Sequence, residues 1–157
     1  MLDLIRLSLF FLLLATISSA GQNSKLGTAN KKQENPCGSA TTQMQLNQCY
    51  GEQYRKVDAR LNAVFGNLMR TMQKALTEAV QRNDVDEKKY QESSIQKLNA
   101  AENAWVAYRA LHCDAARHQV EGGSMSPMAW AACMAATTDD RISELKNAYE
   151  DGDFKLE

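Results

Sequence analysis

The stretch VDARLNAVFGNLMRTMQKAL, residues 57–76, carries the clearest helical pattern in the sequence. Its apolar residues recur every three or four positions, which places them along one face of an α-helix. Thr42 and Gln45, further upstream, have the spacing of a capping box, in which two side chains satisfy the first free backbone N–H groups of a helix. We therefore expect a long helix from about Thr42 to about Asn83, where a polar turn follows. The predicted buried face comprises Val57, Leu61, Val64, Leu68, Met72 and Leu76.

A second long helix is predicted after this turn, with Asp86 as its N-cap. It should end at the pair Gly122 and Gly123, because glycine gives a helix end the conformational freedom that a tight connection needs. Its predicted buried stripe, again at helical spacing, comprises Ile95, Leu98, Ala101, Trp105, Tyr108, His112 and Ala115.

A third helix is predicted from Ser126, which would act as the N-cap with Pro127 in the first helical position. The polar run at residues 137–140 is expected to interrupt this helix. No alternating strand pattern and no internal repeat is present in the sequence. The sequence thus predicts an all-α fold, a small helical bundle of about three main helices.

The charge balance excludes one class of partner. The 157 residues contain 18 Lys and Arg against 19 Asp and Glu, which gives a formal net charge of −1. No block of basic residues is interleaved with aromatic ones, so the chain offers no pattern for neutralising a phosphate backbone. We expect no nucleic-acid partner, and the length fits a single domain.

The N-terminal segment, residues 1–20, has the features of a secretory signal peptide. Arg6 supplies the positive charge, residues 7–17 form the apolar region, and Ser18-Ser19-Ala20 offers small residues at the cleavage site. The apolar region, about 11 residues, is too short to cross a bilayer. No cysteine follows the cleavage site, so we expect no membrane anchor after cleavage. The mature protein should be periplasmic or secreted.

Beyond the signal peptide the chain is predicted to divide into three parts. Residues 21–36 are polar and are expected to form a flexible arm, because they cannot bury enough apolar surface to become ordered. Residues 37–150 form the predicted helical domain, and residues 151–157 form an acidic tail.

The four cysteines would lie in an oxidising compartment, where an even number usually forms disulfides. Cys113 and Cys133 lie on either side of Gly123 at equal sequence distance, so in a helical hairpin they fall at the same height. Cys37 and Cys49 cannot share one straight helix, because about 18 Å would separate them. Of the three possible connectivities we favour Cys37 with Cys49 and Cys113 with Cys133.

Candidate catalytic and metal-binding groups are few. His112 adjoins Cys113, but neighbours on a helix point about 100° apart, and an oxidised cysteine is no nucleophile. His112 and His118 point about 120° apart, unlike the histidine pair four residues apart that holds zinc. The carboxylates show no pairing for acid and base roles, and no glycine-rich phosphate loop is present. We therefore expect no enzymatic activity, no metal site and no cofactor.

The segment WVAYRALHC, residues 105–113, is the richest in distinctive side chains. Arg109 follows Trp105 by one helical turn, where its guanidinium can stack on the indole or reach another helix. This arrangement suits an aromatic core with a supporting arginine, and it also leaves Arg109 as a candidate partner contact. Asn62, in the middle of the first helix, is expected to form an interhelical hydrogen bond if it faces the core.

Three blocks of sequence together resemble a known family, the bacterial proteins with a lysozyme inhibitor LprI-type N-terminal domain. The first block joins the early cysteine pair to DARLN at residues 58–62, and the second is AWVAYR at residues 104–109 followed by Cys113. The third block places Thr137, Arg141 and Leu145 after Cys133. The core and motif residues of these blocks are Asp58, Leu61, Asn62, Trp105, Tyr108 and Arg141.

The resemblance implies a helical, disulfide-containing envelope protein that inhibits lysozyme without catalysis of its own. Its partner would be lysozyme or another peptidoglycan hydrolase, and inhibition would come from occlusion of the enzyme cleft. Because lysozyme clefts carry catalytic carboxylates, a loop with hydrogen-bond donors is a candidate plug. The alternatives are a plain interhelical turn at this loop, and an envelope scaffold or immunity-type binding module with a different partner. The candidate loop residues are Glu121, Gly122, Gly123 and Ser124.

Overall fold

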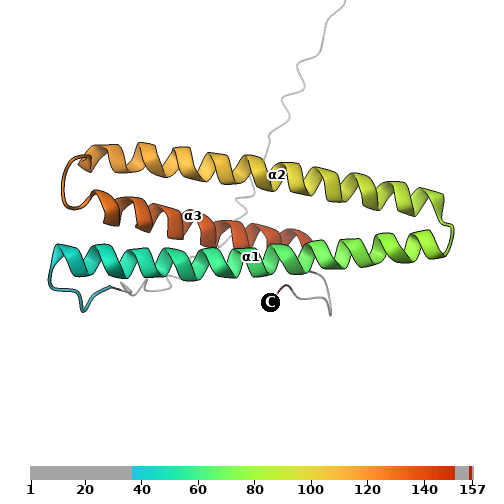
Figure 1. Ribbon diagram of the computed structural model, residues 1–157, viewed down its shortest axis with the longest axis horizontal. Coiled ribbons are helices and arrows are strands. Elements are labelled where there is room, and N and C mark those ends of the chain that lie inside the picture. The colour runs from blue at the N-terminus through green and yellow to red at the C-terminus, as the bar shows by residue number, and fades with distance from the viewer. Residues whose placement is uncertain (1–36, 151–155, 157) are drawn as a thin grey trace, which may run out of the picture. The chain divides into compact units, whose positions relative to one another are not determined.

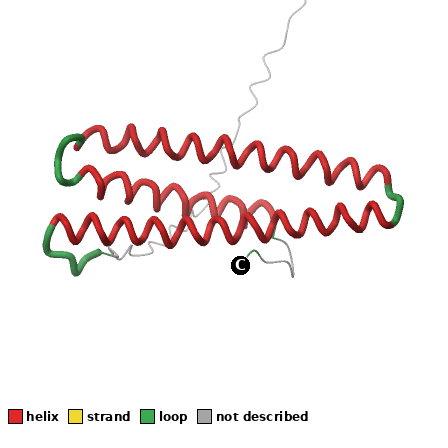
Figure 2. The backbone as a smooth tube through the Cα atoms, in the orientation of Figure 1, coloured by secondary structure: helices red, strands yellow, loops and turns green. Residues whose placement is uncertain are grey.

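The computed structural model describes residues 37–150 and residue 156. Within them the chain forms three α-helices and one short 3₁₀-helix (Figure 1). The remaining described residues form short connections and ends, and no strand occurs among them (Figure 2). The predicted all-α fold is confirmed, whereas the predicted signal peptide and arm, residues 1–36, lie outside the described residues. The elements are α1 (Gln43–Gln81), α2 (Val85–Arg117), η1 (His118–Val120) and α3 (Ser126–Tyr149).

α1 begins where the sequence predicts. The Thr42 hydroxyl accepts a hydrogen bond from the Gln45 backbone N–H at 3.2 Å. In return, the Gln45 side-chain oxygen accepts one from the Thr42 N–H at 3.1 Å. This reciprocal pair satisfies N–H groups that the helix itself cannot satisfy, so the predicted capping box is confirmed.

The turn between α1 and α2 is tighter than predicted. Asn83 has a positive φ of 54°, a conformation that asparagine adopts more readily than most residues. The chain therefore reverses early enough for the Asp84 side chain to accept a hydrogen bond from the Glu87 N–H at 3.0 Å. The predicted N-cap, Asp86, is wrong: Asp84 is the cap, and Asp86 lies in the first turn, where its charge favours the helix dipole.

The face that α2 buries differs from the predicted stripe. Leu98 is buried and Trp105 is partly buried, as predicted, but Tyr108 is 55% exposed. The helix is rotated because two charged residues, whose partners lie on other helices, occupy its buried face. Members of the predicted stripe that are exposed instead are Ala101, Tyr108, His112 and Ala115. The buried residues of α2 are Leu98, Glu102, Arg109 and Cys113.

Two predictions about α3 are also wrong. Ser126 is the first helical residue and not the N-cap; the cap is Met125, which makes no side-chain cap hydrogen bond. The polar run at residues 137–140 does not interrupt the helix. The Thr138 hydroxyl donates to the Met134 carbonyl at 2.6 Å, so its polar group is satisfied inside a continuous helix.

The hydrophobic core joins all three helices. Much of the predicted face of α1 is buried, and Val57 and Met72 pack against the core from its edge. Leu156, in the segment predicted to be an acidic tail, is fully buried in the same cluster. The buried core residues are Leu61, Val64, Leu68, Leu98, Ile142, Leu145 and Leu156.

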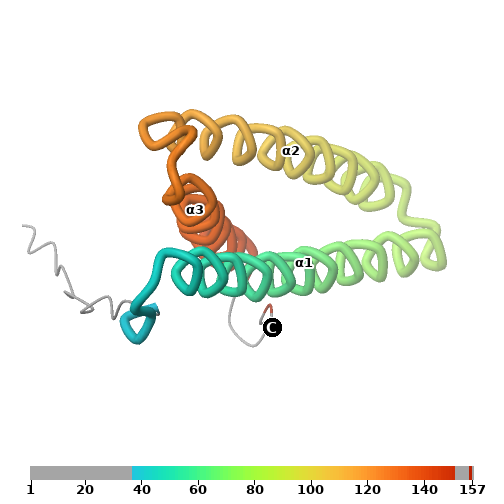
Figure 3. The backbone as a smooth tube through the Cα atoms, turned by 60° about the vertical axis from the view of Figure 1, so that its left-hand side comes forward, coloured from blue at the N-terminus to red at the C-terminus, as the bar shows by residue number. Residues whose placement is uncertain are grey.

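The helices have unequal lengths, and this gives the two ends of the bundle different structures. α3 has 24 residues, against 39 in α1 and 33 in α2. Figures 1 and 3 show α3 alongside the part of α1 and α2 that is farthest from the α1–α2 turn. In the described part of the chain, no helix combines the length and apolar character needed to cross a membrane. The end that contains all three helices also carries the α2–α3 loop.

Candidate functional site

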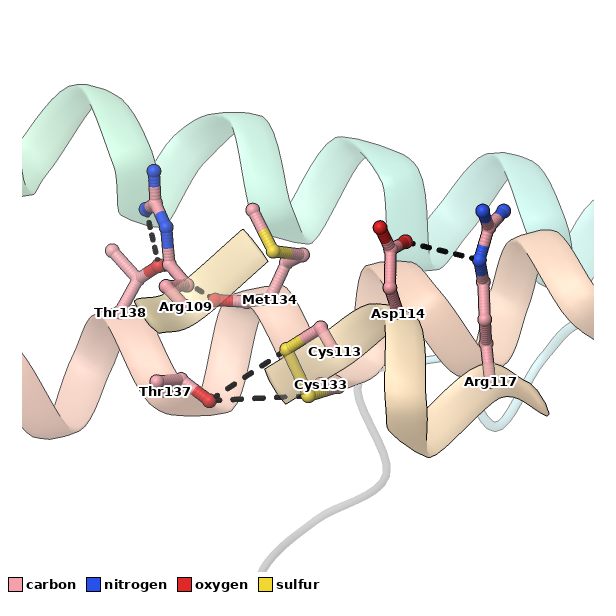
Figure 4. The surroundings of a disulfide bond; sticks show 8 residues. All are labelled: Arg109, Cys113, Asp114, Arg117, Cys133, Met134, Thr137 and Thr138. Carbon is pink, nitrogen blue, oxygen red and sulfur yellow. Dashed lines mark hydrogen bonds and ion pairs between the residues drawn. A yellow bond between two sulfur atoms is a disulfide. The ribbon is translucent and has the colours of Figure 1, made fainter. Parts of the chain in front are cut away.

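Both disulfides lie at the three-helix end. Cys37 is bonded to Cys49, with 5.9 Å between their Cα atoms. Cys113 of α2 is bonded to Cys133 of α3, with a Cα–Cα distance of 5.5 Å (Figure 4). The predicted connectivity is confirmed. Because all four cysteines are oxidised, Cys113 cannot act as a nucleophile.

The α2–α3 loop, residues 121–124, is exposed along its whole length. Gly122 has a positive φ of 76°, which explains the need for glycine in this turn. The Gly123 N–H donates to the Val120 carbonyl at 3.1 Å. From the start of α1, the Asn47 side-chain amide donates to the Ser124 carbonyl at 3.0 Å. The loop is therefore held by the Cys113–Cys133 disulfide behind it and by α1 beside it.

A hollow of about 730 Å³ opens next to this loop. Trp130 lines it and packs edge-on against Tyr54 of α1, with 5.4 Å between the ring centroids. On its α2 side Arg117 donates from Nε to Asp114 at 3.1 Å, as Figure 4 shows. The residues that line the hollow come from all three helices and the loop, so this end of the bundle offers a concave, mixed apolar and polar surface.

Next to the hollow, an ionic cluster ties the helices together. Arg109 donates from Nη1 to Asp58 of α1 at 2.7 Å and to the Thr138 hydroxyl of α3 at 2.8 Å. Its guanidinium also lies 4.8 Å from the centroid of the Trp105 ring, as the one-turn spacing predicts. The Arg109 side chain is only 9% exposed. Arg109 therefore lies inside the helical packing. Little of its side chain is accessible for the predicted contact with a partner.

A second arginine completes this cluster. Arg141 of α3 donates from Nε and Nη2 to Glu102 of α2, both at 3.0 Å. Its guanidinium lies 5.7 Å from the centroid of the Trp105 ring. Burial lowers the pKa of Arg141, but hydrogen bonds to Glu144 and Glu102 outweigh this and hold the pKa above its ordinary value. Arg141 thus stays charged and links α3 to α2.

The structure separates the six predicted core and motif residues into three groups. Asp58, Trp105 and Arg141 meet in the ionic cluster, and Leu61 lies in the apolar core. Asn62 lies on the exposed face of α1, so the condition on which an interhelical hydrogen bond was expected, that Asn62 faces the core, is not met. Tyr108 stacks on the ring of His112 on the surface of α2, with 5.3 Å between the centroids.

The sequence did not predict three residues that connect the elements at this end of the molecule: Glu102, Thr138 and Asn47. Glu102 precedes Arg109 by seven positions, the distance of two helical turns, so charge spacing could have placed both on one face. Thr138 and Asn47 gave no such signal, because their hydrogen-bond partners lie far away in the sequence.

Tyr54 contacts both Arg109 of the ionic cluster and Trp130 of the hollow, and the burial of its phenol can be tested. Burial raises the pKa of Tyr54 above its ordinary value of 10.0; Arg109 lowers it and Asp58 raises it. Stability from the neutral phenol is therefore present below about pH 10 and is lost as the pH rises through the folded-state pKa. In urea titrations above about pH 10, Tyr54→Phe should lose less stability with rising pH than the wild type.

Tyr108, which is 55% exposed, offers the matched control for this titration, since Tyr108→Phe removes a phenol outside the cluster. If the free energy of unfolding fell equally with rising pH in the wild type and in Tyr54→Phe, burial of the Tyr54 phenol would have no effect on stability.

The described residues thus define a disulfide-braced, three-helix protein with an exposed loop anchored on both sides. Residues 34–145 match the family model of the lysozyme inhibitor LprI. The chain belongs to the LprI lysozyme inhibitor family, as the resemblance of its three sequence blocks implied. A relative is the uncharacterized protein R02472 of Rhizobium meliloti (strain 1021), 36% identical over 123 residues, which are 78% of this chain and 85% of that protein. No solved structure matches the chain.

Family membership bears on three of the expectations above. The family is one of inhibitors rather than enzymes, and it implies a protein partner such as lysozyme. Together with the two disulfides, it points to an extracytoplasmic protein.

Among the described residues, no group of three or more His, Cys, Asp or Glu side chains is arranged to hold a metal ion.

Proposed function

We propose that this protein acts in the periplasm or outside the cell as an inhibitor of lysozyme, and that its α2–α3 loop occludes the cleft of the enzyme. The observation that carries the proposal is an exposed loop anchored by Asn47 on one side and by the Cys113–Cys133 disulfide on the other. A loop held in this way loses little conformational entropy on binding, which favours affinity.

The chemistry of the loop suits a cleft that contains carboxylates. Gly122 and Gly123 carry no side chain, so the backbone can approach a partner closely. The N–H groups of Glu121 and Gly123 already donate to carbonyls of η1, so the backbone N–H groups of Gly122 and Ser124 are the ones that would donate hydrogen bonds to an ionised carboxylate. Such charge-assisted bonds are among the stronger ones. The adjacent hollow, with Trp130 on its wall, would receive apolar atoms from the rim of the enzyme cleft.

A lysozyme assay tests both the activity and the loop. Purified, fully oxidised protein should slow the lysis of suspended peptidoglycan by lysozyme. Ser124→Trp adds bulk to the exposed loop without removing the carbonyl that Asn47 contacts, and it should raise the inhibitor concentration needed by about tenfold or more.

The matched control is Val85→Trp, which introduces the same side chain at the first residue of α2, at the opposite end of the molecule, where Val85 is 74% exposed. It should inhibit like the wild type. No inhibition by oxidised wild-type protein at micromolar excess would overturn the proposed function. Inhibition that Ser124→Trp leaves unchanged would overturn the role of the loop alone.

A further inference from the structure

Arg117, the last residue of α2, leaves much of its hydrogen-bonding capacity unused. Its Nε lies 3.1 Å from the Asp114 carboxylate, as Figure 4 shows. Among the residues that the structure describes, no hydrogen bond or ion pair involves either Nη group. The Arg117 side chain is 43% exposed, so a partner can reach it. A guanidinium that is oriented through Nε and free at both Nη groups matches the two oxygens of a carboxylate.

Arg117 is part of the wall of the hollow beside the α2–α3 loop. The same hollow of about 730 Å³ is lined by Gly122 of the loop and by the apolar side chains of Pro127, Trp130 and Ala131. Ligand sites commonly combine such an apolar wall with a few well-placed polar groups. The hollow therefore suits a group that joins a carboxylate to an apolar stem.

The polar groups of the hollow favour an anion over a cation. Asp114 is the one acidic residue among the described residues that line it, and its carboxylate already faces Arg117. The Asn47 amide is engaged too, because it donates to the Ser124 carbonyl. The Nη groups of Arg117 and the N–H of Gly122 remain as free donors. A carboxylate would complete their hydrogen bonds, whereas a cation would be repelled by Arg117.

We propose that the hollow is a carboxylate-binding site, and that Arg117 binds a carboxylate of the lysozyme cleft there. The identity of the partner rests on the proposed function. A lysozyme cleft contains a pair of catalytic carboxylates, and the α2–α3 loop and Arg117 offer two separate sets of donors at one end of the bundle. Asp114 acts as a positioning residue, since it orients the guanidinium before binding and so lowers the entropic cost.

A titration with a small carboxylate tests the hollow without lysozyme. The probe is phenylbutyrate, and phenylbutyramide is an uncharged molecule of nearly the same shape. The chain contains two tryptophans, so proton–nitrogen correlation NMR gives separate indole signals for Trp130 in the hollow and Trp105 in the ionic cluster. Phenylbutyrate should shift the Trp130 signal at millimolar concentration and bind about fivefold more tightly than the amide. The Trp105 signal should not move.

Three variants identify the groups that hold the probe. Arg117→Gln should abolish the preference for the carboxylate, because it removes the charge and the paired donors. Arg60→Gln is the matched control, since Arg60 also faces an aspartate in an exposed ion pair but does not line the hollow. Asp114→Asn should tighten phenylbutyrate binding about threefold, because it removes a competing negative charge and keeps an oxygen for the Arg117 Nε. A hollow built for cations would lose affinity in the same variant.

Calorimetric binding to lysozyme tests the source of the carboxylate. Arg117→Gln should weaken binding to lysozyme by about tenfold or more, whereas Arg60→Gln should bind like the wild type. The side chains of Arg117 and Arg60 are both well exposed in the single chain, so both variants should keep the helical content of the wild type by circular dichroism.

The results separate the site from its partner. Equal affinity for phenylbutyrate and the amide, or unchanged phenylbutyrate binding in Arg117→Gln, would overturn the carboxylate site. Lysozyme binding that Arg117→Gln leaves unchanged would overturn the role of Arg117 in the complex. A wild-type protein that does not bind lysozyme would overturn the proposed function and the assigned partner, while the titration would still decide whether the hollow binds a carboxylate.

Discussion

Asp58→Ala is expected to lower the free energy of unfolding by about 2–3 kcal/mol, a large effect for a single truncation on the edge of a core. The substitution removes the carboxylate that accepts a hydrogen bond from Arg109 at 2.7 Å. The Arg109 side chain, 9% exposed, would then remain in the interior without its counter-charge. Buried charges that lose a partner cost about 3–5 kcal/mol, and the 32% exposure of the Asp58 side chain reduces this value.

Arg109 has little capacity to compensate for this loss. Its Nε is buried and has no hydrogen-bond partner among the described residues. Its contacts with Thr138 and Trp105 remain, but neither supplies a negative charge. Water would have to enter the bundle, or the guanidinium would have to leave it, and either change disturbs the packing of α2 on α1 and α3.

Asp139→Ala is the matched control for this prediction. It removes the carboxylate of the ion pair with Arg60, in which both side chains are 56% exposed. Such surface pairs contribute about 0–1 kcal/mol. Urea denaturation followed by circular dichroism would compare the two variants. A cost for Asp58→Ala no larger than that of Asp139→Ala would show that the Arg109–Asp58 pair does not stabilise the bundle.

The features of the fold that sequence could predict are those encoded by neighbouring residues. The apolar period of α1 and the capping box of Thr42 depend on spacings of three or four residues. The Gly122–Gly123 turn and the Cys113–Cys133 pairing follow from a helical hairpin, which is also a local arrangement. These predictions succeeded because each needs only the chain within one or two elements.

The buried face of α2 could not be predicted in the same way. Glu102 and Arg109 are buried because Arg141 and Asp58, on other helices, neutralise them. Hydropathy assigns such residues to the surface and turns the predicted stripe toward Tyr108, which is exposed. Leu156 was missed for a related reason, since one leucine in a polar segment carries no periodic signal. The loop 121–124 was a candidate from sequence, but its anchoring by Asn47 depends on tertiary packing.

Removal of the Cys113–Cys133 disulfide should reduce lysozyme inhibition by more than the loss of stability explains. Cys113→Ser with Cys133→Ser opens a bridge between residues 20 apart, and the chain-entropy model gives a loss of about 3 kcal/mol. Cys37→Ser with Cys49→Ser opens a bridge between residues 12 apart, with a loss of similar size in that model. Double variants leave no single thiol that could form intermolecular bonds. The two proteins therefore provide a comparison at similar global stability.

The two disulfides differ in what they hold. Cys113–Cys133 joins the helices that flank the α2–α3 loop, whereas Cys37–Cys49 ties the segment before α1 back onto that helix. If the loop occludes the lysozyme cleft, its anchoring must matter more than the stability of the whole domain. Lysozyme inhibition, measured at a temperature where circular dichroism shows both variants folded, should fall at least about tenfold further for the 113–133 variant. Equal losses in the two variants would contradict this, because they would trace inhibition to general stability and leave the loop without a special role.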